Sequence, residues 1–446
     1  MTEASTAPGG TPRPDPAASL GGDGGAASGG GAGGGDEFSR GFGRFLVARA
    51  VSWAGSAVTL VALPLLMYQH TGNAALTGLL AALEAIPYMV LGLPAGAWAD
   101  RLDPRRVLVV SNLASGALLA TIPLAEAFGV LFAAHLLVVA AASASALTFS
   151  DAAGFRALAA LTPPGQMGVA TGRLSSVSTV IGLAGPAAGG ALAAGLGAGN
   201  AIALDAATFA ASALLMARLP LGPTPLTGPS SAARSLRADI AEGLRWVWRH
   251  RLVRTLTLLG VGNSLTAGFI TGLVVVVAVR QLGLTTDDGR VGLLYAAAGA
   301  GSLLASLMLA RVQRALPVGW VTLAGLAAGL VFLGCWAASR SLVTGALALL
   351  GWQAANTLVS LNGIVVRQTV APLELQARVN TSARIIAWGG QPLGAAAGGV
   401  LAEHAGLGWA LLLAGAGLAV SLAAGLCTRL RATHRLATLT AAASPA

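Results

Sequence analysis

Long apolar segments recur along almost the whole chain, and they constrain its fold more than any other feature of the sequence. An α-helix rises about 1.5 Å per residue, so roughly 20 apolar residues cross a hydrocarbon core about 30 Å thick. Because lipid offers no partners to backbone polar groups, each such span must be a helix. The predicted fold class is therefore all-α integral membrane, with twelve transmembrane helices. We place them at about residues 44–69, 74–99, 105–127, 130–154, 167–195, 199–219, 252–280, 288–311, 316–338, 341–368, 376–402 and 407–430.

Composition excludes several other classes of protein. With 55% hydrophobic and 10% charged residues, the chain does not resemble soluble domains. The net charge of +10 could suggest nucleic-acid binding, but the basic residues are scattered in short loops, so we expect no nucleic-acid partner. All 27 are arginines, a bias that is typical of a GC-rich bacterial genome.

The sequence also lacks the usual signatures of cofactor and metal sites. Cys335 and Cys427 fall inside apolar segments, where a thiol behaves as a small hydrophobe, so we expect neither a disulfide nor a metal site. We find no phosphate-binding glycine-rich loop, no metal-ligand cluster and no nucleophile–base pair. We therefore predict no cofactor and no enzymatic activity.

The arginines predict how the chain is oriented. Arg280, Arg290 and Arg340 fall on one side of the predicted spans, and the other arginines fall on the opposite side or in the tails. Cytoplasmic loops carry the excess of basic residues in membrane proteins. We therefore expect a multi-pass protein of the bacterial inner (plasma) membrane, with both termini in the cytoplasm and an even number of spans.

Composition shifts divide the chain into five regions. A tail rich in Gly, Ala, Pro and Ser has nothing to bury and is predicted to be disordered. The linker in the middle of the chain contains apolar residues at helical spacing, including Leu244, Val247 and Trp248, with Arg245 and Arg249 on another face. This pattern predicts an amphipathic helix at the cytoplasmic membrane surface. The regions are the tail 1–37, a six-span half 38–219, the linker 220–251, a second six-span half 252–435 and a cytoplasmic tail 436–446.

The loop between the second and third spans is unusually rich in charge. Gly96 and Asp100 are one helical turn apart, so a small contact surface would sit above a carboxylate on one face. Arg101, Asp103-Pro104, Arg105 and Arg106 follow. The pattern resembles the loop between helices 2 and 3 of the major facilitator superfamily, with Asp103-Pro104 where that family usually has Gly. The linker sequence from Asp239 to His250 resembles the superfamily branch of enterobactin-exporter-like and macrolide-efflux-like proteins.

The two halves repeat one another in sequence. Arg156, Pro164, Arg173 and Gly189-Gly190 in the first half correspond to Arg367, Pro372, Arg384 and Gly398-Gly399 in the second. The resemblance implies parallel halves of six helices each, related by an axis along the membrane normal. It also implies secondary active transport by alternating access between the halves.

Charged residues at the cytoplasmic span ends predict a gate. Arginine can hold a carboxylate with two hydrogen bonds, whereas membrane anchoring alone would explain the arginines but not the acids. The candidate gate residues are Gly96, Asp100, Arg101, Arg105, Arg106, Asp151, Arg156 and Arg378. A separate motif in the fifth span would permit close helix contact and a local kink, and it resembles the exporter-type signature of the superfamily. It consists of Gly182, Gly185, Pro186, Gly189 and Gly190.

Two acids fall inside predicted spans. A carboxylate in the bilayer centre costs about 2.5–3.5 kcal/mol on insertion scales, so each needs a reason to be there. Glu84 is about ten residues into the second span, and Asp205 is about a turn and a half into the sixth. Either could carry a coupling proton. Each could also serve as a buried hydrogen-bonding group that only holds helices together.

These observations predict an exporter of small apolar or amphipathic compounds, such as drugs, antibiotics or siderophores, that acts as a monomer. Proton antiport is inferred from the resemblance and from Glu84, because the fourth span begins at His135 without the Arg that many proton antiporters carry there. One alternative is an ABC-type permease subunit, which would need a separate ATPase. Another is a lipid scramblase, which would work without an ion gradient.

Overall fold

The computed structural model describes residues 32–99, 101–163, 165–221, 236–372 and 375–432. The first half of the chain contains α1 (Ala32–Thr71), α2 (Ala74–Val90), α3 (Gly92–Ala99), α4 (Pro104–Ala127), α5 (Ala133–Leu161), α6 (Met167–Leu196) and α7 (Ala198–Ala217). The second half contains α8 (Leu236–Arg249), α9 (Arg251–Arg280), α10 (Val291–Ala315), α11 (Val318–Ala338), α12 (Leu342–Val370), α13 (Gln376–Trp388), α14 (Gly390–His404), α15 (Leu407–Cys427) and the short 3-10 helix η1 (Arg429–Ala432).

The helices account for every predicted span. Within the described residues, 11 helical stretches are long and apolar enough to cross a membrane, and α2 is a shorter apolar helix. Only Leu91 separates α2 from α3, and only Gly389 separates α13 from α14, so each of these pairs forms one span. The prediction of an all-α membrane protein is therefore confirmed.

The helix α1 begins at Ala32, within the last residues of the tail that we predicted at 1–37. Once a helix is formed, each further residue adds a hydrogen bond for little extra ordering, so a strongly anchored helix can extend into a sequence of low propensity. Residues 1–31 and 433–446 lie outside the described part of the chain.

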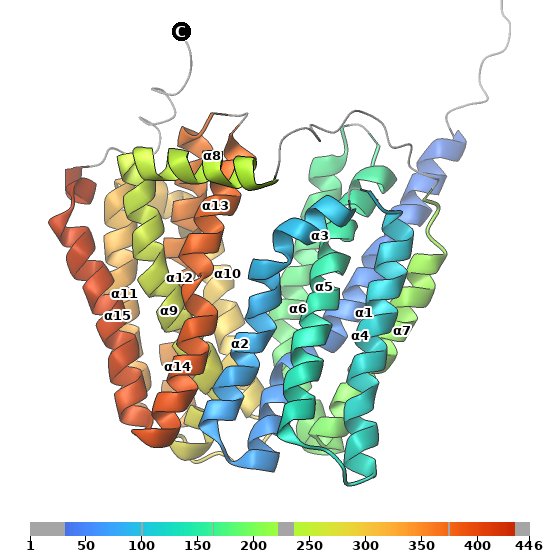
Figure 1. Cartoon of the computed structure of the whole chain (residues 1–446), viewed down its shortest axis with the longest axis horizontal. Helices are drawn as coiled ribbons and strands as arrows, with labels where there is room; N and C mark the ends of the chain where they lie inside the picture. The colour runs from blue at the N-terminus through green and yellow to red at the C-terminus, as the bar shows by residue number, and fades with distance from the viewer. Residues whose placement is uncertain (1–31, 100, 164, 222–235, 373–374, 433–446) are drawn as a thin grey trace, which may run out of the picture.

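The spans form two groups that lie side by side, α1–α7 and α9–α15 (Figure 1). The amphipathic helix α8 lies across one end of the second group, nearly at right angles to the spans, and α1 begins and α15 ends at that same end (Figure 1). We call this the linker end and the opposite end the far end. An even number of crossings follows, since the described chain starts and finishes on the same side.

A small cluster of Ala81, Ala82 and Ala395 joins the two groups, and their main shared core lies at the far end. One hydrophobic cluster there contains residues of both groups, among them Leu66, Ile202, Val276 and Leu411. Toward the linker end the first group has its own cluster around Phe45 and Leu158, and the second has separate clusters around Leu326 and Val379. The structure is therefore closed between the halves at the far end.

Glycine pairs bring helices of the two halves into close contact at this end. A Cβ on Gly190 of α6 would lie 2.5 Å from the Gly289 carbonyl oxygen and 2.7 Å from Gly292 Cα of α10. In the same way, a Cβ on Gly399 of α14 would lie 2.9 Å from Gly78 Cα of α2. The paired glycines of the sequence repeat thus contact equivalent elements, the second spanning segment of the opposite half.

Candidate functional site

A cavity of about 400 Å³ lies between the two halves, at the middle of the spans. Its wall combines apolar and aromatic groups, including Leu60, Met89 and Trp388, with Glu84 from the first half and Arg384 from the second. A neighbouring cavity of about 340 Å³ lies within the first half and shares Leu60, Glu84 and Tyr88 with it. Ligand sites typically have this size and this mixture of apolar walls with few polar groups.

Glu84 stands between these two cavities. It lies on α2, three residues before the buried Pro87, and it lines both cavities. Within the described residues we find no hydrogen bond or ion pair to its carboxyl group. A buried strut would hold a partner, since polar groups inside proteins are nearly always hydrogen-bonded. The carboxyl of Glu84 is therefore available to a ligand, water or a proton.

Asp205 has the opposite environment. It is 1% exposed on α7, where its carboxylate accepts hydrogen bonds from the hydroxyls of Thr59 (2.5 Å) and Thr208 (3.0 Å). A Cβ on Gly55 of α1 would collide with the side chains of Asp205 and Thr208, so only glycine fits there. This arrangement holds α1 against α7 and is that of a hydrogen-bonding strut.

An arginine at the far end joins the two halves. Arg280 of α9 donates to the Tyr68 hydroxyl (2.8 Å) and the Gly72 carbonyl (3.1 Å) of the first half. It also pairs with Glu403 of α14 at 2.8 Å, and Glu403 in turn accepts the backbone N–H of Ala74 at 2.9 Å. The hydrogen bonds that we find between the halves, within the described residues, lie at this end. We call Arg280, Glu403 and Tyr68 the far-end lock.

Three of the predicted gate residues, Asp151, Arg156 and Arg378, have described partners at the linker end. Asp151 pairs with the buried Arg49 of α1 at 2.6 Å, and the Arg49 guanidinium lies 4.6 Å from the Trp53 ring centroid. Arg156 donates to the Leu102 carbonyl at 3.1 Å. Arg378 of α13 pairs with Glu242 of α8 at 2.5 Å, which ties the linker helix to its own half.

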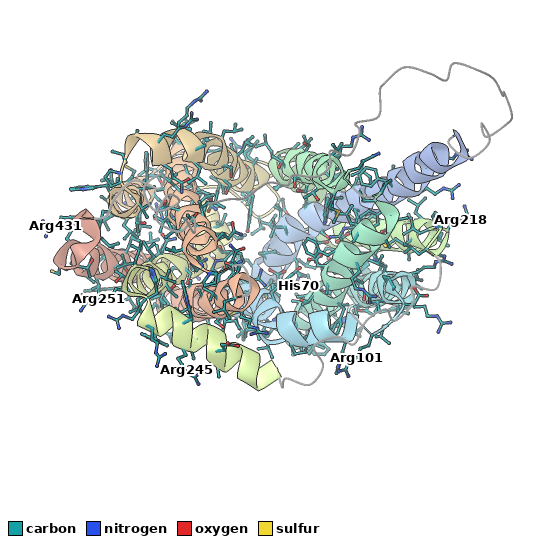
Figure 2. The ribbon with its side chains drawn as sticks, turned by 90° about the horizontal axis from the view of Figure 1, so that it is seen from above. His70, Arg101, Arg218, Arg245, Arg251 and Arg431 are labelled. Atoms are coloured by element: carbon teal, nitrogen blue, oxygen red, sulfur yellow. The ribbon has the colours of Figure 1, made fainter. Side chains whose placement is uncertain are left out.

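The loop after α3 contributes mostly exposed charges. Arg105 donates to the Leu221 carbonyl at 2.5 Å, and Arg106 lies 3.8 Å from Asp103. Arg101 is exposed at the edge of the linker end (Figure 2). Asp100 lies outside the described residues. A Cβ on Gly96 would meet nothing, so the small contact surface that we expected there is open in this structure.

The motif in the fifth span lies on α6 and packs against two helices. A Cβ on Gly185 would lie 2.5 Å from Ala57 Cβ of α1, and a Cβ on Gly189 would lie 2.7 Å from Val58 Cα of the same helix. Gly190 packs against α10, as described above. Pro186 is buried within the helix, whereas a Cβ on Gly182 would meet nothing. Close helix contact therefore uses three of the four predicted glycines.

Sequence reasoning missed several of the residues that join helices. Arg49 and Arg280 were interpreted only as charges that set orientation, and Glu403, Thr59 and Gly55 were not considered. Glu403 carried a usable signal, since it is an acid in the last turn of a span. The partners of the others are 102 to 212 residues away along the chain, a separation that no local pattern reveals.

No set of three or more His, Cys, Asp or Glu side chains that could hold a metal ion is found in the described ranges.

Comparison with known proteins agrees with this geometry. Residues 45–380 match the family model of the Major Facilitator Superfamily. The multidrug efflux pump Tap of Mycolicibacterium fortuitum is 30% identical over 375 residues, which cover 81% of this chain and 89% of that protein. Tap of Mycobacterium tuberculosis (strain ATCC 25618 / H37Rv) is 32% identical over 221 residues, 48% of this chain and 52% of that one.

A crystal structure of a bacterial homolog of the human lysosomal transporter Spinster, inward-facing and occupied, has the same fold. It superposes with a TM-score of 0.70 at 16% identity, covering 89% of this chain and 97% of that one. The family match excludes the ABC-type permease that we considered from the sequence. The chain therefore belongs to the Major Facilitator Superfamily, and it is a multi-pass membrane protein of a transporter family, not an enzyme.

Proposed function

We propose that this protein exports small apolar or amphipathic compounds by proton antiport, with alternating access between its two halves. The observation that carries the proposal is the cavity of about 400 Å³ between the halves, whose apolar and aromatic wall contains the unpaired carboxyl group of Glu84. Such a wall accepts many apolar molecules because burial of apolar surface is non-directional. The 30% identity to Tap, which is named a multidrug efflux pump, supports a drug-like substrate.

The direction of access supports export. The arginine distribution predicts that the linker end is cytoplasmic, and the labelled Arg101, Arg218, Arg245, Arg251 and Arg431 lie around the periphery of the molecule in the view onto that end (Figure 2). The halves are joined at the far end, so the cavity is open toward the cytoplasmic side. An exporter must collect its substrate from this side.

Glu84 is the first candidate for the coupling proton. Its carboxyl group lies in the substrate cavity without a partner, so substrate and proton can compete for it. Asp205 already accepts two hydroxyl donors and holds α1 to α7, so it is the second candidate. In both cases the proton would be taken up when the cavity faces one side and released when it faces the other.

The experiment that tests the proposal is transport by the purified protein in proteoliposomes. We expect an imposed pH gradient to drive accumulation of an amphipathic dye such as ethidium, and a protonophore to abolish it. A rate of dye accumulation that does not depend on the pH gradient would contradict proton antiport. Lipid scrambling in the same vesicles without any gradient would instead support the scramblase alternative.

The linker-end charges are proposed to form a gate in the opposite, outward-facing state. In the outward-facing state, Asp100 would lie at the positive N-terminal end of α13, near Asn380 and Ser382. We expect Asp100→Asn to leave the protein inserted but to reduce transport sharply. Arg156→Ala should weaken the same gate, whereas Arg340→Ala at the far end should do little. Equal losses in both arginine variants would show that these arginines serve only insertion.

The same proposal covers three further assignments. The two moving halves are residues 38–219 and 252–435, and the linker is 220–251. The linker helix α8 is held to the second half by the ion pair between Glu242 and Arg378. The protein acts as a monomer, because one chain contains the complete cavity. The linker sequence resembles that of the enterobactin-exporter-like and macrolide-efflux-like branch, and this resemblance favours antibiotics or siderophores as substrates.

A further inference from the structure

A third cavity lies inside the second half and differs in character from the central one. It has a volume of about 260 Å³ and runs between α9, α12 and the α13–α14 span. Trp388 and Gln391 line both this cavity and the central one, so the two are neighbours. We call it the side cavity.

The side cavity contains a buried arginine. Arg367 of α12 is 4% exposed and lines the cavity. Its Nε lies 3.4 Å from Asn380 Oδ1, a long hydrogen bond, and no carboxylate of the described chain pairs with it. A Cβ on Gly363, one turn earlier, would lie 3.4 Å from Arg367 Nη1, so this glycine leaves room for the guanidinium. Within the described residues we find no acceptor for the other two guanidinium nitrogens, Nη1 and Nη2.

The sequence repeat shows that this placement is particular to the second half. Arg156 is the counterpart of Arg367, yet it is half-buried and donates to the Leu102 carbonyl near the linker end. Burying a guanidinium without an anion is costly, and the usual solution is a paired carboxylate. The described residues of the second half supply none at this position.

The remaining wall of the side cavity is suited to an anion. None of its lining residues is Asp or Glu, so Arg367 gives it a net positive charge. Polar side chains with N–H or O–H donors line it as well, namely Thr322, Asn356, Ser360 and Gln391. Trp388 closes the side toward the central cavity, and the guanidinium of Arg384 lies 5.7 Å from its ring centroid.

We propose that the side cavity is a subsite for an oxyanion, and that Arg367 binds the carboxylate of a transported amphipathic acid whose apolar part lies against Trp388. The planar donor fork of arginine matches a carboxylate, and neutral donors around it complete the coordination. This inference rests on the proposed export function and narrows its substrate class. A lipid phosphate or free phosphate presents the same chemistry, so the test must separate these sources.

The first test uses two ligands of the same shape. We would titrate the purified full chain in detergent with 1-naphthaleneacetate and with 1-naphthaleneacetamide, which has the same ring without the charge. We expect the acid to bind about 10- to 100-fold more tightly, the range of a charge-assisted hydrogen-bonded pair. Arg367→Gln should remove this preference and leave the affinity for the amide nearly unchanged. Arg340→Gln, at the exposed far end, is the matched control.

A second test keeps Arg367 in place, in case its replacement prevents folding. Ser360→Cys, with Cys335 and Cys427 changed to Ser, should react faster with an anionic methanethiosulfonate than with a cationic one. Ser341→Cys at the far end should show no such preference. Equal rates at position 360, or equal binding of acid and amide to the wild type, would overturn the subsite.

Competition identifies the source of the anion. Displacement of naphthaleneacetate by inorganic phosphate at millimolar concentration, or by phosphatidylglycerol but not by other amphipathic acids, would overturn the assignment to substrate. The binding tests need no pH gradient. If acid binding depends on Arg367 but no export is found in proteoliposomes, the proposed function fails while the oxyanion site stands.

Discussion

The far-end lock should control the balance between the two facing states. Gln69 of the first half also joins the halves at this end, by donating to the Thr286 carbonyl and to Asp287. Arg280 donates to two groups of the opposite half, Tyr68 at 2.8 Å and Gly72 at 3.1 Å. Both bonds must break when the far end opens. Replacing Arg280 by Ala removes them and leaves Glu403 with the N–H of Ala74. The variant should therefore populate the far-end-open state more than the wild type.

The size of the shift follows from the environment of these bonds. The Arg280 side chain is 32% exposed, so water weakens each bond, and about 1 kcal/mol apiece is a reasonable value. A total of about 2 kcal/mol changes the equilibrium roughly 30-fold. If about 1% of wild-type molecules are open at the far end, about a quarter of the Arg280→Ala molecules should be.

Spin labels on the two halves can measure this population. Val130 follows α4 and Arg340 precedes α12, so cysteines at these positions report the separation of the halves at the far end. Cys335 and Cys427 are exposed and must first be replaced by Ser. In pulsed dipolar spectroscopy, Arg280→Ala should increase the long-distance population.

Arg290→Ala is the matched control for loss of an arginine at the same end. Arg290 pairs with Asp288 at 2.6 Å, inside the α9–α10 loop of its own half. The Arg290→Ala variant should leave the distribution of distances between the two spin labels unchanged. The reasoning is refuted if Arg280→Ala also leaves it unchanged, or if Arg290→Ala shifts it as strongly.

Three further outcomes are expected. Glu84→Gln should permit substrate binding and passive exchange but abolish uphill export in proteoliposomes; export with unchanged pH dependence would show that the proton is carried elsewhere. Gly190→Ala should push α6 away from α10 and lower the free energy of unfolding by about 1–3 kcal/mol, which would appear as a lower thermal midpoint. Gly182→Ala should leave the thermal midpoint unchanged. His250 Nδ1 caps α9 by accepting the N–H of Val253, and burial lowers the pKa of His250 below 6.5. Protonation removes that acceptor, so the cap is present above pH 6.5 and is lost as the pH falls through the lowered pKa. The protection of the amides at the start of α9, corrected for the intrinsic pH dependence of exchange, should then fall on acidification in the wild type but not in His250→Asn, which keeps an acceptor. A fall in protection that persists in this variant would contradict the assignment.

Much of the fold could be predicted because the membrane limits the choices. A long apolar segment must be a helix and must cross, so hydropathy alone located all twelve spans. The repeat of Gly189-Gly190 in Gly398-Gly399 indicated two equivalent halves. The structure shows why these pairs recur, since each brings a helix of one half against the other half. Other residues indicated the family, namely the charged loop from Gly96 to Arg106 and the linker from Asp239 to His250.

Less of the candidate site could be predicted. Position at a span end marked Asp151, Arg156 and Arg378 as candidate gate residues, but it did not reveal that Asp151 pairs with Arg49 or that Arg378 pairs with Glu242. Glu84 and Asp205 were equivalent in sequence, as acids inside spans. Only packing distinguishes the carboxyl that lines two cavities from the one that two threonines hold.

The sequence by itself determined the number and approximate ends of the spans, because these depend on local hydropathy, and it predicts their direction from the charge of short loops. Only the tertiary structure decided which ends of the halves meet and which charges find partners. Arg156 and Arg367 illustrate the difference, since they occupy equivalent places in the repeat and yet one donates to a surface carbonyl while the other lies in a cavity without an acid. The reason is physical: an ion pair requires atoms within about 4 Å, and helix neighbours far apart in sequence set that distance.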